Sequence, residues 1–165
     1  TDRLAEVAQQ YPQTDIIINV QGDEPLMEPE LIDALCEVML AEGKLEMATA
    51  KTLMCEEEYG NPASVKVVTD KDGYALYFSR SLLPYPRNSE DLKVYKHIGI
   101  YAYRRDFLLK FSSLAQGYLE KIESLEQLRA LENGNKIKVI ETDFAAVGVD
   151  TEEDLQRVRE ILSKQ

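Results

Sequence analysis

The chain has 165 residues, 44% of them hydrophobic and 30% charged, which is typical of one globular domain with a sizeable core. Its formal net charge of −11 excludes nonspecific nucleic-acid binding, because that needs a basic surface. No apolar run approaches the roughly 20 residues of a membrane-spanning helix, so we expect no membrane partner. Cys36 and Cys55 form no C-x-x-C pattern, and we expect both to be reduced in a cytoplasmic protein.

The first residues predict a helix from Thr1, its cap, to Tyr11, with Leu4, Val7 and Ala8 on the same face as Tyr11. A buried strand follows directly. An α/β domain usually carries another β-α unit before such a strand. We therefore expect residues 1–165 to be a single domain that lacks its first β-α unit.

Residues Ile16 to Val20 form an apolar, β-branched run, typical of a central strand that is buried on both faces of a parallel sheet. Gly22 allows a sharp turn after it, and Pro25 prevents the strand from continuing. Asp23 is thus predicted just beyond the carboxyl end of the strand, where open α/β sheets bind ligands. Its carboxylate could hold a divalent metal, and the alternative is a solvated acidic turn.

The middle of the chain predicts a helix followed by four strands. The helix runs from Pro29 to about Glu42 and has an apolar stripe. The strands are Met47–Leu53, Ser64–Thr69, Tyr74–Phe78 and Val94–Tyr103. A hairpin turn at Asp70–Gly73 joins the second strand to the third. The acidic run at 56–58 is expected to be a solvated helical turn, because consecutive helical residues point away from one another.

The last third predicts three more helices and a strand. The first helix is 105–111. The second begins at Tyr118, is ended by Gly134 and has a stripe of leucines and isoleucine (Ile122, Leu125, Leu128, Leu131), and the final one ends near Lys164. The strand is 136–141. The elements together predict a three-layer α/β fold, in which a mixed, mainly parallel sheet carries helices on both faces. The hairpin and the strand near His97 are expected to form an antiparallel extension.

Several segments carry a resemblance to a known family. Val20-Gln21-Gly22-Asp23-Glu24-Pro25 resembles the signature of the CMP-Kdo synthetases, the 3-deoxy-manno-octulosonate (Kdo) cytidylyltransferases, which have a sugar-nucleotidyltransferase fold. The other similar segments are Thr1-Asp-Arg3, Asn61-Pro-Ala-Ser-Val-Lys-Val-Val68, Gly73-Tyr-Ala-Leu-Tyr-Phe-Ser-Arg80, Glu123-Ser-Leu-Glu-Gln-Leu-Arg129 and Gly148-Val-Asp-Thr151. The loop with glycine, arginine and lysine that opens the family and cradles the triphosphate is not matched. We therefore expect the isolated chain to be inactive.

The resemblance implies an enzyme that transfers CMP from CTP to the anomeric hydroxyl of Kdo, releasing pyrophosphate, for lipopolysaccharide biosynthesis. It implies a homodimer, and Mg²⁺ as cofactor. The resemblance also implies that Asp23 and Asp150 are the catalytic metal ligands. From the residues alone, Asp150 could instead be the residue that precedes a helix N-terminus.

The resemblance also assigns substrate-binding residues. On the nucleotide side it implies Arg3, and Gln21 belongs to the binding set through its signature. On the acid-sugar side it implies arginines for the carboxylate, a histidine ring that donates a hydrogen bond, a tyrosine, and an acid–amide pair for the hydroxyls. These residues are Arg80, Arg87, His97, Tyr101, Glu126 and Gln127.

Most of these residues have a structural alternative. Arg3 could be a surface arginine, and Arg80 could cap a local turn and pair with a surface acid. His97 could be a core histidine that is satisfied by a backbone carbonyl. Glu126 and Gln127 could belong to a charged helix surface.

Two other functions stay open. One is a related CTP-dependent nucleotidyltransferase for another acid sugar, such as an amino-Kdo or sialic acid, which the sugar that supports turnover would reveal. The other is a non-catalytic interaction domain, which would bind neither CTP nor Mg²⁺.

Overall fold

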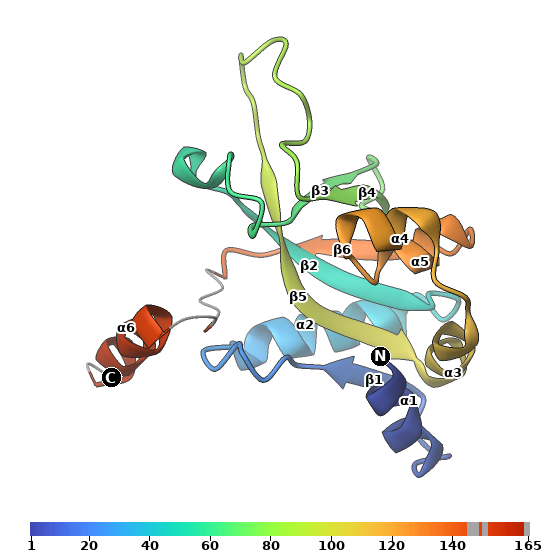
Figure 1. Cartoon of the computed structure of the whole chain (residues 1–165). Helices are drawn as coiled ribbons and strands as arrows, with labels where there is room; N and C mark the ends of the chain where they lie inside the picture. The colour runs from blue at the N-terminus through green and yellow to red at the C-terminus, as the bar shows by residue number, and fades with distance from the viewer. Residues whose placement is uncertain (145–148, 150–151, 164–165) are drawn as a thin grey trace.

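The structure is a computed structural model that describes residues 1–144, 149 and 152–163. It contains a six-stranded sheet with helices on both faces (Figure 1). The strands are β1 (Ile16–Asn19), β2 (Met47–Leu53), β3 (Lys66–Thr69), β4 (Ala75–Ser79), β5 (Tyr95–Arg104) and β6 (Ile137–Glu141). The helices are α1 (Asp2–Gln9), α2 (Pro29–Ala41), α3 (Arg105–Ser113), α4 (Tyr118–Glu123), α5 (Leu128–Glu132) and α6 (Glu152–Leu162), with a 3₁₀ turn at Glu56–Glu58.

The sheet is mixed but mostly antiparallel, so the expectation of a mainly parallel sheet is wrong. The order is β4-β3-β5-β2-β6, and β1 also pairs with β5. Among the described strands only β2 and β6 pair in parallel. The reason is β5, which runs antiparallel to each of its three neighbours, β1, β2 and β3. Since β1 and β2 both oppose β5, the strands β1, β2 and β6 nevertheless point the same way.

Strand β1 lies at an edge, so the expectation that it is central and fully buried is also wrong. Within the described chain it pairs with β5 alone, and its residues are half-buried. Its apolar run has another cause. Ile16 and Ile18 pack on one face of the sheet and Ile17 on the other, and both faces are covered by helices.

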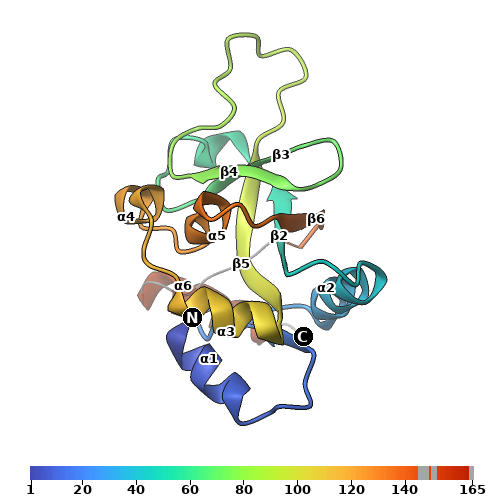
Figure 2. The ribbon, with the colours of Figure 1, turned by 90° about the vertical axis from the view of Figure 1, so that its right-hand side faces the viewer.

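The two faces of the sheet carry separate cores. Helix α2 covers one face, while α1, α3 and α5 pack on the other (Figure 2). Strand β5 serves both cores because its side chains alternate between the faces. Ile98, Ile100 and Ala102 face α2, and Tyr103 faces the opposite core.

The helix predicted to begin at Tyr118 and to end at Gly134 is two helices. Ser124 adopts a left-handed conformation with φ of 53°, which ends α4 and redirects the chain into α5. Leu125 and Leu128 are buried as predicted, but Ile122 is 68% exposed. The helical period therefore places Ile122 wrongly, because the period does not continue through the left-handed residue.

The apolar face predicted for the first helix is only partly buried, and the last helix also buries little. In α1 the buried residues are Ala5 and Ala8, whereas Val7 and Tyr11 are exposed. In α6 Val158 is buried, whereas Leu162 is half exposed. No helix in the described ranges has the length and apolar character to cross a bilayer.

The hairpin between β3 and β4 forms as predicted. The Asp70 carboxylate accepts hydrogen bonds from the backbone N–H groups of Asp72 and Tyr74, and Gly73 takes a φ of +80°. The segment between β4 and β5, residues 80–94, extends away from the sheet (Figure 1).

Candidate functional site

The segments that follow the carboxyl ends of β1 and β6 meet at the same end of the strands. Asp23 lies in the turn after β1, and its side chain is exposed. The backbone N–H of Val149, in the segment after β6, donates to the backbone carbonyl of Asp23 across 2.8 Å. Asp150 lies outside the described residues. In the described ranges no group of three or more His, Cys, Asp or Glu residues is arranged to hold a metal.

Gly99 lies on β5 between the places where two neighbouring strands pair with it. Strand β1 ends opposite Tyr101, and β3 begins to pair at Lys96. The Gln21 side chain lies over the intervening stretch, since a Cβ added at Gly99 would be 3.8 Å from its Cγ. Side chains at alternate positions of a strand share a face, so Gln21 covers the face that carries His97 and Tyr101.

Aromatic rings follow this face of β5. The His97 ring lies 5.0 Å from the Phe78 ring, edge to face, and 5.3 Å from the Tyr101 ring. The Tyr101 ring stacks at 5.9 Å on that of Tyr103. Burial raises the pKa of both tyrosines, and the nearby Glu126 carboxylate raises each further. Both phenols are therefore neutral and can donate hydrogen bonds.

His97 is a buried, neutral histidine. It is 9% exposed, and burial lowers its pKa to about 3. Its Nε2 lies 2.9 Å from Oγ1 of Thr49. The residue is thus satisfied by a side-chain hydroxyl and not by the backbone carbonyl of the structural alternative.

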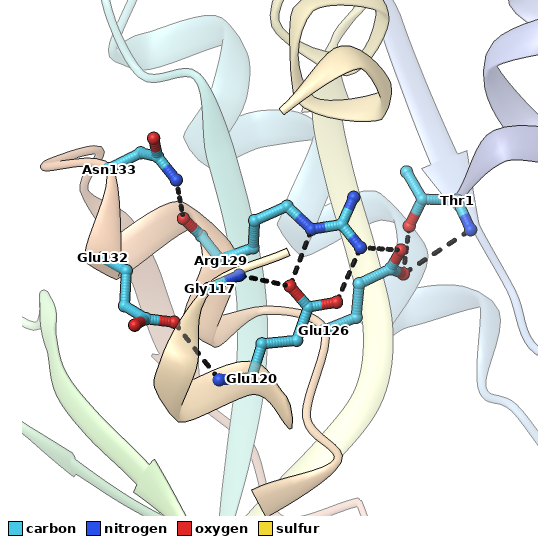
Figure 3. A network of polar contacts seen from close by, with 7 residues as sticks. All are labelled: Thr1, Gly117, Glu120, Glu126, Arg129, Glu132 and Asn133. Atoms are coloured by element: carbon cyan, nitrogen blue, oxygen red, sulfur yellow. Dashed lines mark hydrogen bonds and ion pairs between the residues drawn. The ribbon is translucent and has the colours of Figure 1, made fainter. Parts of the chain in front are cut away.

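A polar network joins α4, α5 and the start of the chain (Figure 3). Arg129 donates from Nε and Nη2 to the two carboxylate oxygens of Glu120, at 2.8 and 2.6 Å. The same Nη2 lies 3.4 Å from Glu126, whose other carboxylate oxygen accepts from the Thr1 hydroxyl. The Arg129 guanidinium lowers the pKa of Glu120, and the pKa of Arg129 is raised in return. The network fixes Glu126 beside the aromatic row.

Glu126 also borders an open pocket of about 440 Å³, which is lined by Gln116, Glu120, Lys121, Ser124, Glu126 and Arg129. Its side chain is 42% exposed, so it is reachable from this pocket. The adjacent Gln127 is only 5% exposed, which is inconsistent with a charged helix surface at that position.

Arg80 lies where the turn-capping alternative puts it. Its guanidinium donates to three backbone carbonyls: Nε to Glu123 at 2.8 Å, Nη1 to Pro62 at 3.0 Å and Nη2 to Ser124 at 3.4 Å. Its backbone N–H donates to the Glu123 carboxylate. Arg80 therefore ties the end of β4 to the end of α4, next to the pocket that Ser124 lines.

Two of the predicted substrate-binding residues lie apart from the aromatic row and its neighbours. Arg3 is exposed on α1, and Arg87 is exposed in the extended segment between β4 and β5. The structure thus gathers Gln21, His97 and Tyr101 on one face of β5, with Glu126 close to the phenols.

Three residues of this region were missed in the sequence analysis. Thr49 lies within the predicted strand Met47–Leu53, where a threonine indicates a strand preference and nothing more. Arg129 stands three residues after Glu126, a spacing at which helical side chains meet, and this acid–base pair was the available signal. No sequence signal pointed to Glu120, because the left-handed Ser124 lies between it and Arg129.

Comparison with known proteins identifies relatives over nearly the whole chain. A family model described as cytidylyltransferase matches residues 1–137. The 3-deoxy-manno-octulosonate cytidylyltransferase of Fusobacterium nucleatum is 54% identical over 159 residues, 96% of this chain and 65% of that protein. The protein of the same name from Geotalea uraniireducens is 51% identical over 176 aligned positions, 99% of this chain and 70% of that protein. The chain thus spans about two thirds of the length of these relatives.

Solved structures agree with these matches. A CMP:2-keto-3-deoxy-manno-octonic acid synthetase complexed with CTP superposes with a TM-score of 0.94 at 43% identity, covering 99% of this chain and 67% of that one. A 4-diphosphocytidyl-2C-methyl-D-erythritol synthase from Anaerococcus prevotii has a TM-score of 0.59 at 15% identity, over 96% of this chain and 64% of that one, which indicates a shared fold alone.

Proposed function

The chain belongs to the cytidylyltransferase family, with the 3-deoxy-manno-octulosonate cytidylyltransferases, and on that premise we propose that the full-length protein makes CMP-Kdo from CTP and Kdo. The anomeric oxygen of Kdo forms a bond to the α-phosphorus of CTP. The bond from that phosphorus to the β-phosphate oxygen breaks, and pyrophosphate leaves. Such transfers depend on positioning and on charge neutralisation.

One observation carries the acid-sugar half of this proposal. His97, Tyr101 and Glu126 come from β5 and from the segment before α5, yet they lie together around the aromatic row. A neutral imidazole, a neutral phenol and a carboxylate are groups that bind sugar hydroxyls. We also assign Gln127, the amide next to Glu126, to the sugar hydroxyls.

We assign the Kdo carboxylate to Arg80. A guanidinium has five N–H donors, of which Arg80 uses three on backbone carbonyls. The other two N–H groups are available for a carboxylate, and the three carbonyl contacts hold the guanidinium in a single orientation. Arg87 and Arg3 are proposed as additional contacts to sugar and nucleotide, made from exposed positions.

We assign the metal to Asp23 and Asp150. Asp23 is an exposed carboxylate at a strand end, and the hydrogen bond from Val149 ties the segment that leads into Asp150 to the same turn. Oxygen ligands of this kind suit Mg²⁺. Mg²⁺ bound there would neutralise charge on the triphosphate and activate the sugar hydroxyl. Gln21 lies over Gly99 beside this turn, between the proposed metal and sugar sides.

Family membership also supports a cytoplasmic homodimer that works in lipopolysaccharide biosynthesis. Cys36 and Cys55 are both free, which fits a reducing compartment. Light scattering of the purified full-length protein should give twice the mass of one chain, and a monomer at working concentration would contradict the dimer.

The reaction is tested by pyrophosphate release from the full-length protein with Mg²⁺, CTP and Kdo. Each substrate is omitted or replaced in turn, CTP by other nucleoside triphosphates and Kdo by an amino-Kdo or sialic acid. Release should require CTP and be fastest with Kdo. Faster release with another acid sugar would assign the protein to that sugar, and no binding of CTP or Mg²⁺ would favour a non-catalytic domain.

A further inference from the structure

Thr49 occupies an irregular part of the pairing between β2 and β5. It pairs with Tyr101, whereas the next residue, Ala50, pairs with Ile98, so the register shifts between them. Gly99 and Ile100 are the extra residues on β5, and such a bulge disturbs the regular hydrogen-bond ladder. The Thr49 side chain fills the irregularity and is fully buried.

The Thr49 hydroxyl has three neighbours but a single proton. Its Oγ1 lies 2.7 Å from the carbonyl oxygen of Ile100, 3.2 Å from that of Ile98 and 2.9 Å from Nε2 of His97. Carbonyl oxygens only accept hydrogen bonds, and two oxygens 2.7 Å apart without a proton between them would repel, so the hydroxyl proton goes to the Ile100 oxygen. The hydroxyl then faces His97 with a lone pair, and Nε2 must carry the proton of that hydrogen bond.

A neutral imidazole has one N–H, so this arrangement leaves Nδ1 without a proton and as an acceptor. The ring is neutral because burial lowers the His97 pKa to about 3. Within the described residues the Thr49 contact is the one hydrogen bond of the ring, and the residue remains 9% exposed. Phe78 and Tyr101 hold the ring plane from two sides.

We propose that Thr49 is a positioning residue that holds His97 in its Nε2–H tautomer, so that Nδ1 accepts a hydrogen bond from a hydroxyl of the sugar substrate. The inference rests on the proposed function for the identity of that substrate. It reverses the direction expected from the sequence, in which the ring donates to a hydroxyl or carboxylate. An acceptor nitrogen favours a hydroxyl, and it disfavours a carboxylate at the same position because the two lone pairs would repel.

The tautomer is measured directly by long-range ¹H–¹⁵N correlation spectra of the full-length protein, with the His97 signals identified by their loss in His97→Gln. Protonated and unprotonated ring nitrogens have well-separated ¹⁵N shifts, so the wild-type spectrum decides the tautomer even if neither Thr49 variant folds. We expect a protonated Nε2 and an unprotonated Nδ1. A protonated Nδ1 in the wild type would overturn the inference.

Thr49→Val and Thr49→Ser test the hydroxyl. Valine keeps the shape but has no acceptor for Nε2–H, so we expect the ring to move toward the Nδ1–H tautomer; serine keeps the hydroxyl and should keep the Nε2–H form. The KM for Kdo should rise roughly tenfold or more in Thr49→Val, with a much smaller change in the KM for CTP. An unchanged tautomer in a folded Thr49→Val variant would refute the role of Thr49.

Different measurements test the proposed function and the role of Thr49. Absence of pyrophosphate release from the wild-type protein with CTP and Kdo would refute the proposed function. The spectra do not depend on turnover, and they alone decide whether Thr49 sets the tautomer.

Discussion

The backbone N–H of Val149 donates to the backbone carbonyl of Asp23 across 2.8 Å. This bond joins two segments that are far apart in the chain, the turn after β1 and the segment after β6. Asp23 and Asp150 are the carboxylates that we assign to the metal, and Val149 directly precedes the second of them. The bond is independent of either side chain, so the two carboxylates can be altered without removing it.

Replacement of either aspartate by asparagine in the full-length protein should lower turnover by orders of magnitude and leave the fold intact. The amide keeps the shape but loses the charge that binds Mg²⁺. Turnover is measured across a Mg²⁺ titration, with Asp33→Asn, an exposed position on α2, as the control. Near-normal turnover at limiting Mg²⁺ would remove that aspartate from the metal site.

Glu126→Gln should weaken the use of Kdo more than the use of CTP. The side chain borders the pocket next to α4, and an amide cannot accept hydrogen bonds at both terminal atoms. We expect kcat/KM for Kdo to fall by a factor that corresponds to roughly 1–3 kcal/mol of lost binding free energy. Glu30→Gln on the exposed side of α2 is the matched control. A raised KM for CTP alone would show that Glu126 is not on the sugar side.

Glu120→Gln should destabilise the fold strongly, unlike Glu126→Gln. The Glu120 and Arg129 side chains are only 6% and 7% exposed, so loss of one charge leaves the other buried without its partner. Such losses cost about 3–5 kcal/mol, whereas half-exposed pairs like Glu126–Arg129 contribute little. Urea unfolding of both variants measures the difference. Equal unfolding free energies would contradict the assignment of Glu120–Arg129 as the pair that holds α4 to α5.

Gly117→Ala should loosen the start of α4. A Cβ at Gly117 would overlap the carboxylate of Glu132, which accepts hydrogen bonds from the backbone N–H groups of Leu119 and Glu120. Displacement of that carboxylate leaves the helix N-terminus uncapped, at a cost of about 1–2 kcal/mol in unfolding free energy. Gly43→Ala is the control, because a Cβ there meets nothing within 4 Å. An equally small effect of both changes would show that Glu132 is free to move.

His97 should make the protein less stable in mild acid. Its pKa is about 3 in the folded state and about 6.5 in the unfolded chain, so the unfolded state takes up the proton first. The contribution of His97 to stability is therefore full above pH 6.5 and is lost as the pH falls from 6.5 toward 3. Relative to His97→Gln, the wild type should lose about 2 kcal/mol of unfolding free energy between pH 7 and pH 5. Parallel pH profiles for the two proteins would contradict a buried neutral ring.

Most secondary-structure elements could be predicted from local patterns. The strand Met47–Leu53 was predicted with the bounds that the structure has, and the turn at Asp70–Gly73 forms as expected. These predictions succeed because alternation, turn residues and helix stops depend on neighbours in the chain. The family resemblance is equally local, since it rests on short motifs such as Gln21-Gly22-Asp23, and the comparisons confirm it.

The pairing of the strands could not be predicted in the same way. The apolar run Ile16–Val20 is compatible with a central strand of a parallel sheet and with an edge strand whose two faces are covered by helices. Only the long strand β5 selects between them, because it runs against β1 and β2 and so makes the sheet mostly antiparallel. Strand direction is a property of pairs, and no single segment encodes it.

The same distinction between local pattern and tertiary contact applies to the chemistry of the site. The sequence alone identifies His97 and Glu126 as side chains that can hydrogen-bond a sugar. Their states depend on partners that are distant in the chain: Thr49 determines which ring nitrogen of His97 is protonated, and Arg129 holds Glu126 beside the aromatic row. Hydrogen bonds and burial act through space, so the proton positions and charges of this site follow from packing and not from any motif.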